Sequence, residues 1–113
     1  MPHCIIEYSD NIANSVSVST LLETVFNGAL TSDLFTEKDI KARALAYSDY
    51  YSGQDNLSFV HVTVKILSGR STDQKSLLSH RILSNLEALS LSSVSLTVEV
   101  CDIDRECYAK TLK

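Results

Sequence analysis

The sequence predicts an α+β domain in which two β-α-β repeats form a four-stranded mixed sheet with two helices on one face. Four short segments carry the apolar or alternating pattern that is typical of strands: residues 3–8, 40–47, 60–66 and 94–101. A helical pattern separates the first segment from the second, and another separates the third from the fourth. We therefore expect the 113 residues to form one domain, with pseudo-repeats at about residues 1–57 and 58–113.

The first repeat is expected to begin with a strand and a helix. Residues 3–8 are apolar-rich and are followed directly by the turn-forming cluster Ser9-Asp10-Asn11. The next segment predicts a helix, because its apolar residues recur at steps of three and four: Val18, Leu21, Leu22, Val25, Phe26, Ala29 and Leu30. The stretch from Ser17 to Thr20 offers capping oxygens, and Thr20 with Glu23 fits a capping box at the start of this helix.

The second strand of the first repeat is expected at residues 40–47. Ile40 and the alanines at 42, 44 and 46 alternate with a second, mostly polar side. Lys41 and Arg43 are two residues apart, so they point to the same face of the sheet. The sequence Ser52-Gly53-Gln54-Asp55-Asn56 then favours a turn into the second repeat.

The second repeat follows the same plan. Four apolar residues between 60 and 66 alternate with His61, Thr63 and Lys65. Ser71 and Gln74 fit a capping box, and the helix that it opens is expected to bury one stripe: Leu78, Ile82, Leu86 and Leu89. Residues 94–101 alternate as the last strand, and the charged residues after them are expected to form a short arm or helix.

The face of the sheet without helices is expected to be mostly polar. It would carry Arg43, Leu45, Tyr47, His61, Thr63, Lys65, Thr97 and Glu99. Such a face is either in contact with water, as is ordinary for an open-faced sheet, or buried in an oligomer. In the second case Lys65 and Glu99 are possible charge partners, and the residues leave both alternatives open.

Composition and charge limit the classes of function. There are 10 Lys and Arg residues against 14 Asp and Glu, and the resulting net charge of −4 argues against general nucleic-acid binding. No apolar run approaches the roughly 20 residues that cross a bilayer. The first residues lack the basic region and the apolar stretch of a signal peptide, so we expect a cytoplasmic protein.

The three cysteines do not indicate a disulfide framework. Cys4, Cys101 and Cys107 are an odd number, and the five residues between the last two match neither a redox pair nor a zinc knuckle. A metal site built from His3, Cys4, His61 and Cys101 would need the strands to converge. The favoured interpretation is that the cysteines are small buried or half-buried residues, and no metal is expected.

Pro2 is the candidate catalytic base. Methionine aminopeptidases generally remove Met1 before a small residue, which would leave Pro2 with a free secondary amine. An α-amino group has an ordinary pKa near 8, and burial or nearby cations lower it towards neutrality. Such an amine could carry a proton at physiological pH. The alternative is that this proline has no function, as in many chains that begin with Met-Pro.

Three cations are candidates for binding an anionic substrate: Lys41, Arg43 and Arg70. Arg70 stands in a glycine-containing turn at a helix start, where backbone N–H groups also favour anions. An arginine suits a planar carboxylate through paired hydrogen bonds. The alternative is that these charges only keep an acidic protein soluble. Neither a G-x-S-x-G nucleophile motif nor a glycine-rich phosphate loop is present in the sequence.

Several segments together resemble the 5-carboxymethyl-2-hydroxymuconate isomerase family of the tautomerase superfamily. They are MPHCIIEYSDNI at the start, DIKAR in the second strand, FVHVTVKILSGRSTDQK and SLTVEV, and they fall in the family's order over nearly the full length. The stretch 66–75 is also similar to the early part of the shorter 4-oxalocrotonate tautomerases, which fits the repeat.

The resemblance implies a fold, an assembly and a mechanism. Members are trimers with inward-facing sheets, which favours the buried alternative for the polar face. The amino-terminal proline, here Pro2, acts as base and then acid on a dienol or unsaturated keto acid, with neither a metal nor an organic cofactor. The family has arginines at the positions of Lys41 and Arg43, so Lys41 departs from the family pattern. Arg70 matches a family arginine. The implied role is the breakdown of aromatic compounds.

The resemblance therefore predicts an isomerase that moves a proton in an unsaturated di- or tricarboxylic 2-hydroxy or 2-oxo acid. Pro2 would be catalytic, and Lys41, Arg43 and Arg70 would bind the substrate carboxylates. Two alternatives remain. One is a related tautomerase that acts on another enol or unsaturated acid, and Lys41 is the hint for it. The other is a trimeric binding protein without catalysis.

Overall fold

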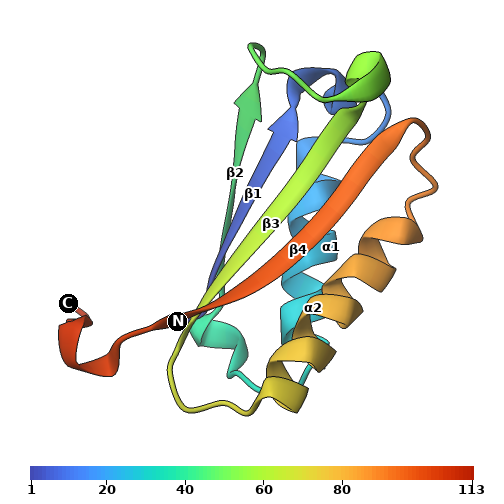
Figure 1. The fold of residues 1–113 in the computed structure, drawn as a ribbon. Coiled ribbons are helices and arrows are strands. Elements are labelled where there is room, and N and C mark those ends of the chain that lie inside the picture. The colour runs from blue at the N-terminus through green and yellow to red at the C-terminus, as the bar shows by residue number, and fades with distance from the viewer.

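The protein contains one four-stranded sheet and two helices (Figure 1). The computed structural model describes the backbone of residues 1–113 and every side chain except that of Gln54. The strands and helices follow one another as β1 (His3–Ser9), α1 (Val18–Thr31), β2 (Lys41–Tyr47), β3 (Ser58–Leu67), α2 (Thr72–Glu87) and β4 (Val94–Ile103). Short 3-10 turns follow β1, precede β2 and follow β4, and the last is Arg105–Cys107.

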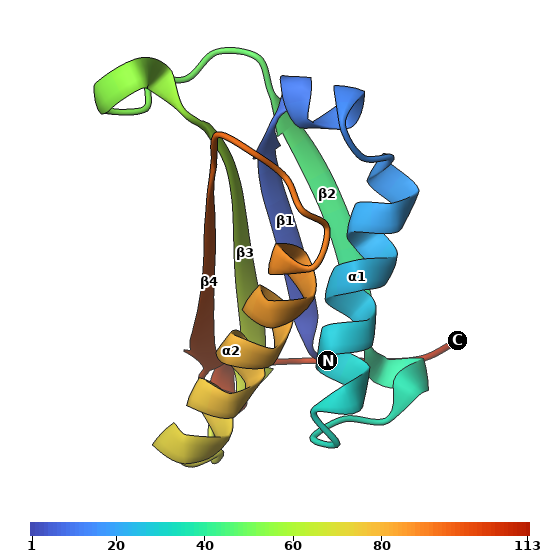
Figure 2. The same ribbon diagram turned by 90° about the vertical axis from the view of Figure 1, so that its right-hand side faces the viewer.

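The sheet has the strand order β2-β1-β3-β4, and it is mixed. β1 pairs in parallel with β2, and β3 pairs in parallel with β4, because each pair is joined through a helix. The two repeats meet where β1 and β3 run antiparallel, with His3 opposite Lys65. Both helices cover the same face of the sheet (Figures 1 and 2). The predicted α+β architecture is confirmed.

The core lies between the sheet and the two helices. Alternate residues of β1 and β3 face the helices and are fully or nearly fully buried: Cys4, Ile6, Tyr8, Val60, Val62, Val64 and Ile66. Leu21 and Val25 of α1 pack onto them, as do Leu78, Ile82 and Leu86 of α2. Leu89, which the sequence placed in the same stripe, is only partly buried because it lies beyond the end of α2.

The other face of the sheet carries the polar side chains that the sequence assigned to it. The register brings Arg43 beside Ile5, Ile5 beside Thr63, and Thr63 beside Glu99. Within the chain, Glu99 pairs with His61 at 2.5 Å. Tyr47 donates a hydrogen bond to Glu7 on the same face. Leu45 is 57% exposed there, so this face is not wholly polar.

Of the two capping boxes predicted at the helix starts, one is confirmed and the other is wrong. Ser71 accepts from the backbone N–H of Gln74, and the Gln74 side chain accepts from the backbone N–H of Ser71, so this capping box is confirmed. The box expected from Thr20 and Glu23 is wrong, because Ser17 is the cap residue and its Oγ accepts from the N–H of Thr20. Thr20 is therefore the third residue of the helix rather than its cap.

The expected turn at residues 52–56 falls in the connection between β2 and β3. The N–H of Ser52 donates to Oδ1 of Asn56 at 2.9 Å, and Asp55 and Asn56 both have positive φ. Asparagine and aspartate adopt that conformation more readily than other non-glycine residues. The side chain of Gln54, which belongs to the same predicted turn, lies outside the described part. Neither described helix is long and apolar enough to cross a membrane.

The two helices touch at Gly28. A Cβ atom at this position would lie 2.8 Å from Cγ1 and 3.1 Å from Cα of Ile82, which is closer than ordinary van der Waals contact. The second of these atoms belongs to the backbone and cannot rotate away. A residue without a side chain is therefore needed for α1 and α2 to pack at this distance.

The substitution Gly28→Ala should lower the free energy of unfolding by about 1–3 kcal/mol, although alanine is the better helix former. The matched control is Asn27→Ala, an exposed site on the same helix, which should be neutral or slightly stabilising. Urea unfolding monitored by circular dichroism measures both. Equal stability of Gly28→Ala and the wild type would show that the helices are not packed at this distance.

Candidate active site

The start of the chain is built into the sheet. Pro2 is fully buried, and its carbonyl accepts a hydrogen bond from the N–H of Lys41 at 3.0 Å, just where β2 begins. The amino group of Met1 donates to the carbonyl of Asp39 at 2.8 Å. The Met1 sulfur accepts from the N–H of Leu67 at 3.2 Å. These contacts fix the first two residues between the beginning of β2 and the end of β3.

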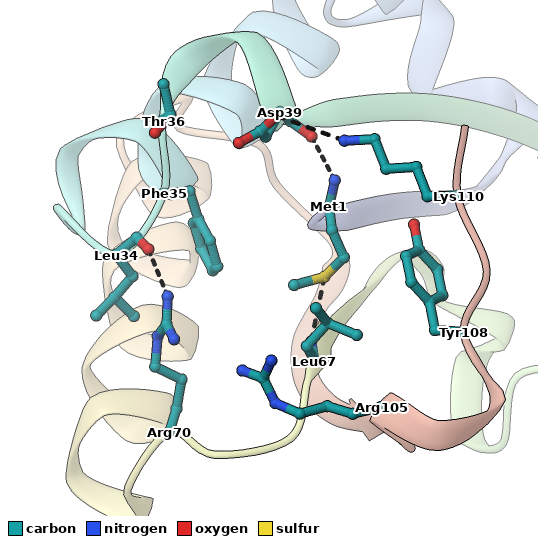
Figure 3. A pocket seen from close by; sticks show the side chains of 10 residues that line it. All are labelled: Met1, Leu34, Phe35, Thr36, Asp39, Leu67, Arg70, Arg105, Tyr108 and Lys110. Carbon is teal, nitrogen blue, oxygen red and sulfur yellow. Dashed lines mark hydrogen bonds and ion pairs between the residues drawn. The ribbon is translucent and has the colours of Figure 1, made fainter. Parts of the chain in front are cut away.

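A cavity of about 350 Å³ surrounds Met1 (Figure 3). Its wall comes from three segments besides Met1: the loop before β2, the loop between β3 and α2, and the chain after β4. The lining residues are Met1, Leu34, Phe35, Thr36, Asp39, Leu67, Arg70, Arg105, Tyr108 and Lys110. Three cations against one carboxylate make the cavity a candidate site for an anionic small molecule.

The chain after β4 forms an arm, residues 104–113, that crosses the edge of the sheet towards β2 (Figure 1). Arg105 donates from Nε to the carbonyl of Ser68 at 2.5 Å. Tyr108 contacts the ring of His3, and Lys110 forms an ion pair with Asp39 at 3.6 Å. The arm therefore joins both repeats and closes the cavity next to the N-terminus.

Arg70 lines the cavity from the turn before α2. Its guanidinium donates to the carbonyl of Leu34 at 2.7 Å and lies 5.7 Å from the centre of the Phe35 ring. Gly69 precedes it with a φ of 123°, a conformation that favours glycine. The helix amide of Gln74 is already used by the Ser71 cap. The Arg70 side chain is the charged group that this turn offers to an anion in the cavity.

The electrostatic surroundings favour a neutral amine at the start of the chain. Burial lowers the pKa of the Met1 amino group below its ordinary value, and the charges of Lys41 and Lys110 lower it further. Asp39 acts in the opposite direction, but its effect is smaller. The lowered pKa is the shift that the sequence led us to expect for a catalytic amine at Pro2, and here it arises at Met1, one residue earlier.

The structure separates the expected cations into two groups. Arg70 lies in the cavity, and Lys41 lies close enough to the Met1 amine to lower its pKa, although it is not part of the cavity wall. Arg43 is exposed on the open face of the sheet, where its guanidinium lies 3.3 Å from Nδ1 of His3. Arg43 therefore reaches the cavity only through other side chains of this chain.

Sequence reasoning missed the residues of the arm. In the sequence, Arg105, Tyr108 and Lys110 could be recognised only as part of a charged terminal segment, because nothing in their spacing links them to Pro2. The available signal was an aromatic residue between basic ones in a segment that follows the last strand. A segment after β4 has to leave the sheet at the end where β1 begins, because β4 runs antiparallel to β1.

His3, Cys4, His61 and Cys101, which were considered together from the sequence, do not converge on one point. Cys4 is buried on the helix side of β1, whereas its neighbour His3 faces the opposite side. Burial raises the pKa of the Cys4 thiol to about 11, as for a small buried residue without a chemical role. In the described part, no three His, Cys, Asp or Glu side chains are grouped to hold a metal ion.

The arrangement of two β-α-β repeats in one mixed sheet is the fold of the tautomerase superfamily of isomerases. A profile of the 5-carboxymethyl-2-hydroxymuconate isomerase family matches residues 2–111. The chain belongs to that family and is an isomerase. No individual curated protein sequence matches it significantly.

Solved structures share the fold. A 5-carboxymethyl-2-hydroxymuconate isomerase from Deinococcus radiodurans R1 is 25% identical, with a TM-score of 0.83 over 99% of this chain and 90% of that chain. A 5-carboxymethyl-2-hydroxymuconate delta-isomerase is 18% identical, with a TM-score of 0.86 over 100% of this chain and 89% of that one. A fused 4-OT symmetric trimer shares the fold at 17% identity, with a TM-score of 0.74 over 92% and 87% of the two chains.

The substitution Lys41→Met should raise the pKa of the Met1 amino group, because it removes a positive charge that opposes protonation. The measurement is the pH dependence of amine acylation, on protein whose mass confirms that Met1 is retained. Lys38→Met is the matched control, since Lys38 is an exposed lysine that does not contribute to the lowered pKa. An identical pKa in the two variants would contradict the assignment of Lys41 to this site.

Proposed function

We propose that this isomerase moves a proton in an unsaturated di- or tricarboxylic 2-hydroxy or 2-oxo acid of the 5-carboxymethyl-2-hydroxymuconate type. Pro2, exposed by removal of Met1, is the general base and then the general acid. The observation that carries the proposal is the position of Pro2, which is fully buried directly behind Met1, and Met1 lines a cavity together with Arg70, Arg105 and Lys110.

Removal of Met1 would transfer the chain's amino group to the Pro2 nitrogen. The Met1 side chain and amine now line the cavity, so their loss would open space beside that nitrogen. Burial and the charges of Lys41 and Lys110 lower the pKa of the present amine, and the proline amine would lie one residue deeper among the same groups. A neutral secondary amine able to accept a proton near pH 7 is the expected result.

The cations bind and polarise the substrate. Arg70 holds a carboxylate inside the cavity, whereas Lys41 and Arg43, at the start of β2 and outside its wall, would hold carboxylates at a site that assembly completes. A volume of about 350 Å³ fits a small organic acid. The positive charge also stabilises the negative charge that develops when the substrate loses a proton, and that difference between ground and transition state accelerates the reaction.

The proton transfer has two steps and needs no other reactant. In the first, the O–H bond of the dienol breaks as the Pro2 nitrogen takes the proton, and the electron pair spreads over the conjugated dienolate. In the second, prolinium gives the proton to a distant carbon, so that a C–H bond forms and the double bonds shift. The enzyme returns to the neutral amine, as a general base must.

We also propose a homotrimer. Several related structures are described as 4-OT symmetric or asymmetric trimers. The open face of this sheet carries exposed Leu45 beside the paired side chains of Tyr47 and Glu7, and an interface would bury that leucine. Lys41 and Arg43 lie on the same face, so assembly would bring them towards a neighbouring subunit.

The second candidate function is tautomerisation of another enol or unsaturated acid at the same site. Lys41 favours it, because the ammonium group offers a point charge where a guanidinium would bind a carboxylate with two parallel hydrogen bonds. A panel of dienol, phenylenol and haloacrylate substrates separates the two candidates by their relative kcat/KM.

The first test blocks the Pro2 nitrogen. Insertion of a leucine between Met1 and Pro2 keeps the methionine in place and turns that nitrogen into an amide, so turnover of 5-carboxymethyl-2-hydroxymuconate should fall to the uncatalysed rate. The measurement is ultraviolet absorbance on protein whose mass defines its first residue. Pro2→Ala keeps a primary amine and should be only partly damaged.

The matched control carries the same extra leucine after Lys113 and should keep full activity. An N-terminally extended enzyme that stays fully active would exclude Pro2 as the base. An inactive wild type with a free Pro2 would instead favour another enol acid, or a trimer that only binds its ligand.

The second test concerns carboxylate binding by Arg70. Arg70→Ala should lower kcat/KM by roughly 10- to 100-fold, the range for losing a hydrogen bond to a charged group. Arg70→Lys should lie between the wild type and Arg70→Ala, because it keeps the charge but loses the planar pair of donors. Arg81→Ala, an exposed site on α2 outside the cavity, is the control. Unchanged kinetics in Arg70→Ala would remove Arg70 from the site.

A further inference from the structure

Tyr108 is the only hydroxyl-bearing aromatic residue among the described lining of the cavity, and its hydroxyl contacts a histidine rather than a carboxylate. The oxygen lies 2.9 Å from Nε2 of His3. The two rings meet edge to face, with centroids 6.0 Å apart. Figure 3 shows the hydroxyl end of the ring directed towards the side of the cavity where Met1 and Lys110 lie.

The other nitrogen of His3 determines the direction of this hydrogen bond. Nδ1 lies 3.3 Å from the guanidinium of Arg43, and a guanidinium has donors but no acceptor. Nδ1 must therefore be the acceptor, which places the ring hydrogen on Nε2. The same hydrogen is present on Nε2 if the ring is protonated, so His3 donates to Tyr108 in either state.

This direction of the hydrogen bond determines which role is left to the hydroxyl of Tyr108. Its oxygen accepts from His3, so its own hydrogen is free for another partner. Within the described residues the hydroxyl makes no second hydrogen bond. Tyr47 provides the contrast, because its hydroxyl donates to Glu7 and its hydrogen is already used. Tyr108 is therefore an oriented donor at the wall of a cavity, one ring away from the N-terminus.

We propose that Tyr108 is a further catalytic residue, whose hydroxyl donates a hydrogen bond to the 2-oxygen of the bound acid, and that His3 is the positioning residue that holds the hydroxyl in this orientation. The proposal rests on the proposed function. A 2-hydroxy or 2-oxo acid presents an oxygen whose negative charge grows as the dienolate forms. A preorganised donor aimed at that oxygen lowers the barrier without itself gaining or losing a proton.

Two further observations support these roles. Burial, with the charges of Arg43, the N-terminus, Lys41 and Lys65, lowers the pKa of His3, which favours the neutral ring near pH 7. Side-chain contacts hold the arm on both sides of Tyr108, since Arg105 donates a hydrogen bond to the carbonyl of Ser68 and Lys110 forms an ion pair with Asp39. The hydroxyl position is thus fixed by the arm, and its direction is fixed by His3.

The kinetic test compares Tyr108→Phe, His3→Leu, His3→Gln and the double variant on 5-carboxymethyl-2-hydroxymuconate. Tyr108→Phe removes only the hydroxyl and should lower kcat by roughly 100-fold, with a smaller change in KM. His3→Leu should lower kcat by about tenfold, the worth of one hydrogen bond. His3→Gln should recover part of that loss, because its amide can replace the N–H donor.

The double variant distinguishes positioning from mere structural support. If His3 acts through Tyr108, adding His3→Leu to Tyr108→Phe should cause no further loss, whereas two independent effects would multiply. Tyr51→Phe is the matched control, because Tyr51 is fully exposed and lies outside the cavity. A Tyr108→Phe enzyme with wild-type kcat would overturn the proposal and leave the proposed function intact.

A binding measurement decides the proposal even if the wild type does not turn over this substrate. The probes are 2-oxoglutarate and glutarate, which differ in the 2-oxygen, titrated by calorimetry into wild type, Tyr108→Phe and Tyr51→Phe. We expect Tyr108→Phe to lose the preference for 2-oxoglutarate while glutarate binds as before. Equal preference in all three proteins, or no preference in the wild type, would overturn the role of Tyr108. If the wild type does not turn over the substrate but prefers 2-oxoglutarate, and Tyr108→Phe loses that preference, only the proposed function is overturned.

Discussion

The placement of β1 in the middle of the sheet is the constraint on which the rest of the structure depends. β1 pairs with β2 on one side and with β3 on the other, so the first residues of the chain enter the molecule between two strands. Pro2 is consequently buried, and its carbonyl accepts a hydrogen bond from the N–H of the first residue of β2. A chain start in this position is rigid, desolvated and close to the loops that end at the same edge of the sheet.

The antiparallel contact between the two repeats explains why those loops converge. β1 begins where β3 ends, because the strands run in opposite directions, and β4 ends beside β3. The turn that carries Arg70 and the arm that carries Tyr108 therefore both emerge next to the N-terminus (Figures 1 and 3). One topological choice thus gathers an amine and cations from distant parts of the sequence, and the lowered pKa of the amine follows first from its burial and then from the nearby lysines.

The two faces of the sheet serve different purposes. The helix side forms a closed apolar core, and its tightest point is the contact between Gly28 and Ile82. The open side carries paired polar groups, among them His61 with Glu99 and Arg43 with His3. The second of these pairs connects the open side to the cavity through Tyr108. A change on the exposed face can therefore alter the site without touching its interior.

The sequence by itself determined the repeats, the sheet and the helix-facing core, because these depend on local periodicity and on short motifs. It also singled out Pro2 and Arg70 as candidate site residues, since a Met-Pro start and a Gly-Arg-Ser turn before a capping box are local patterns. Only the tertiary structure decided that Ser17 caps α1, that Glu99 pairs with His61, and that Arg43 contacts His3. The place of the arm residues Arg105, Tyr108 and Lys110 in the cavity was likewise decided only by the tertiary structure. Their roles arise from contacts across 37 to 105 positions of the chain, where the strand register rather than sequence spacing sets which side chains meet.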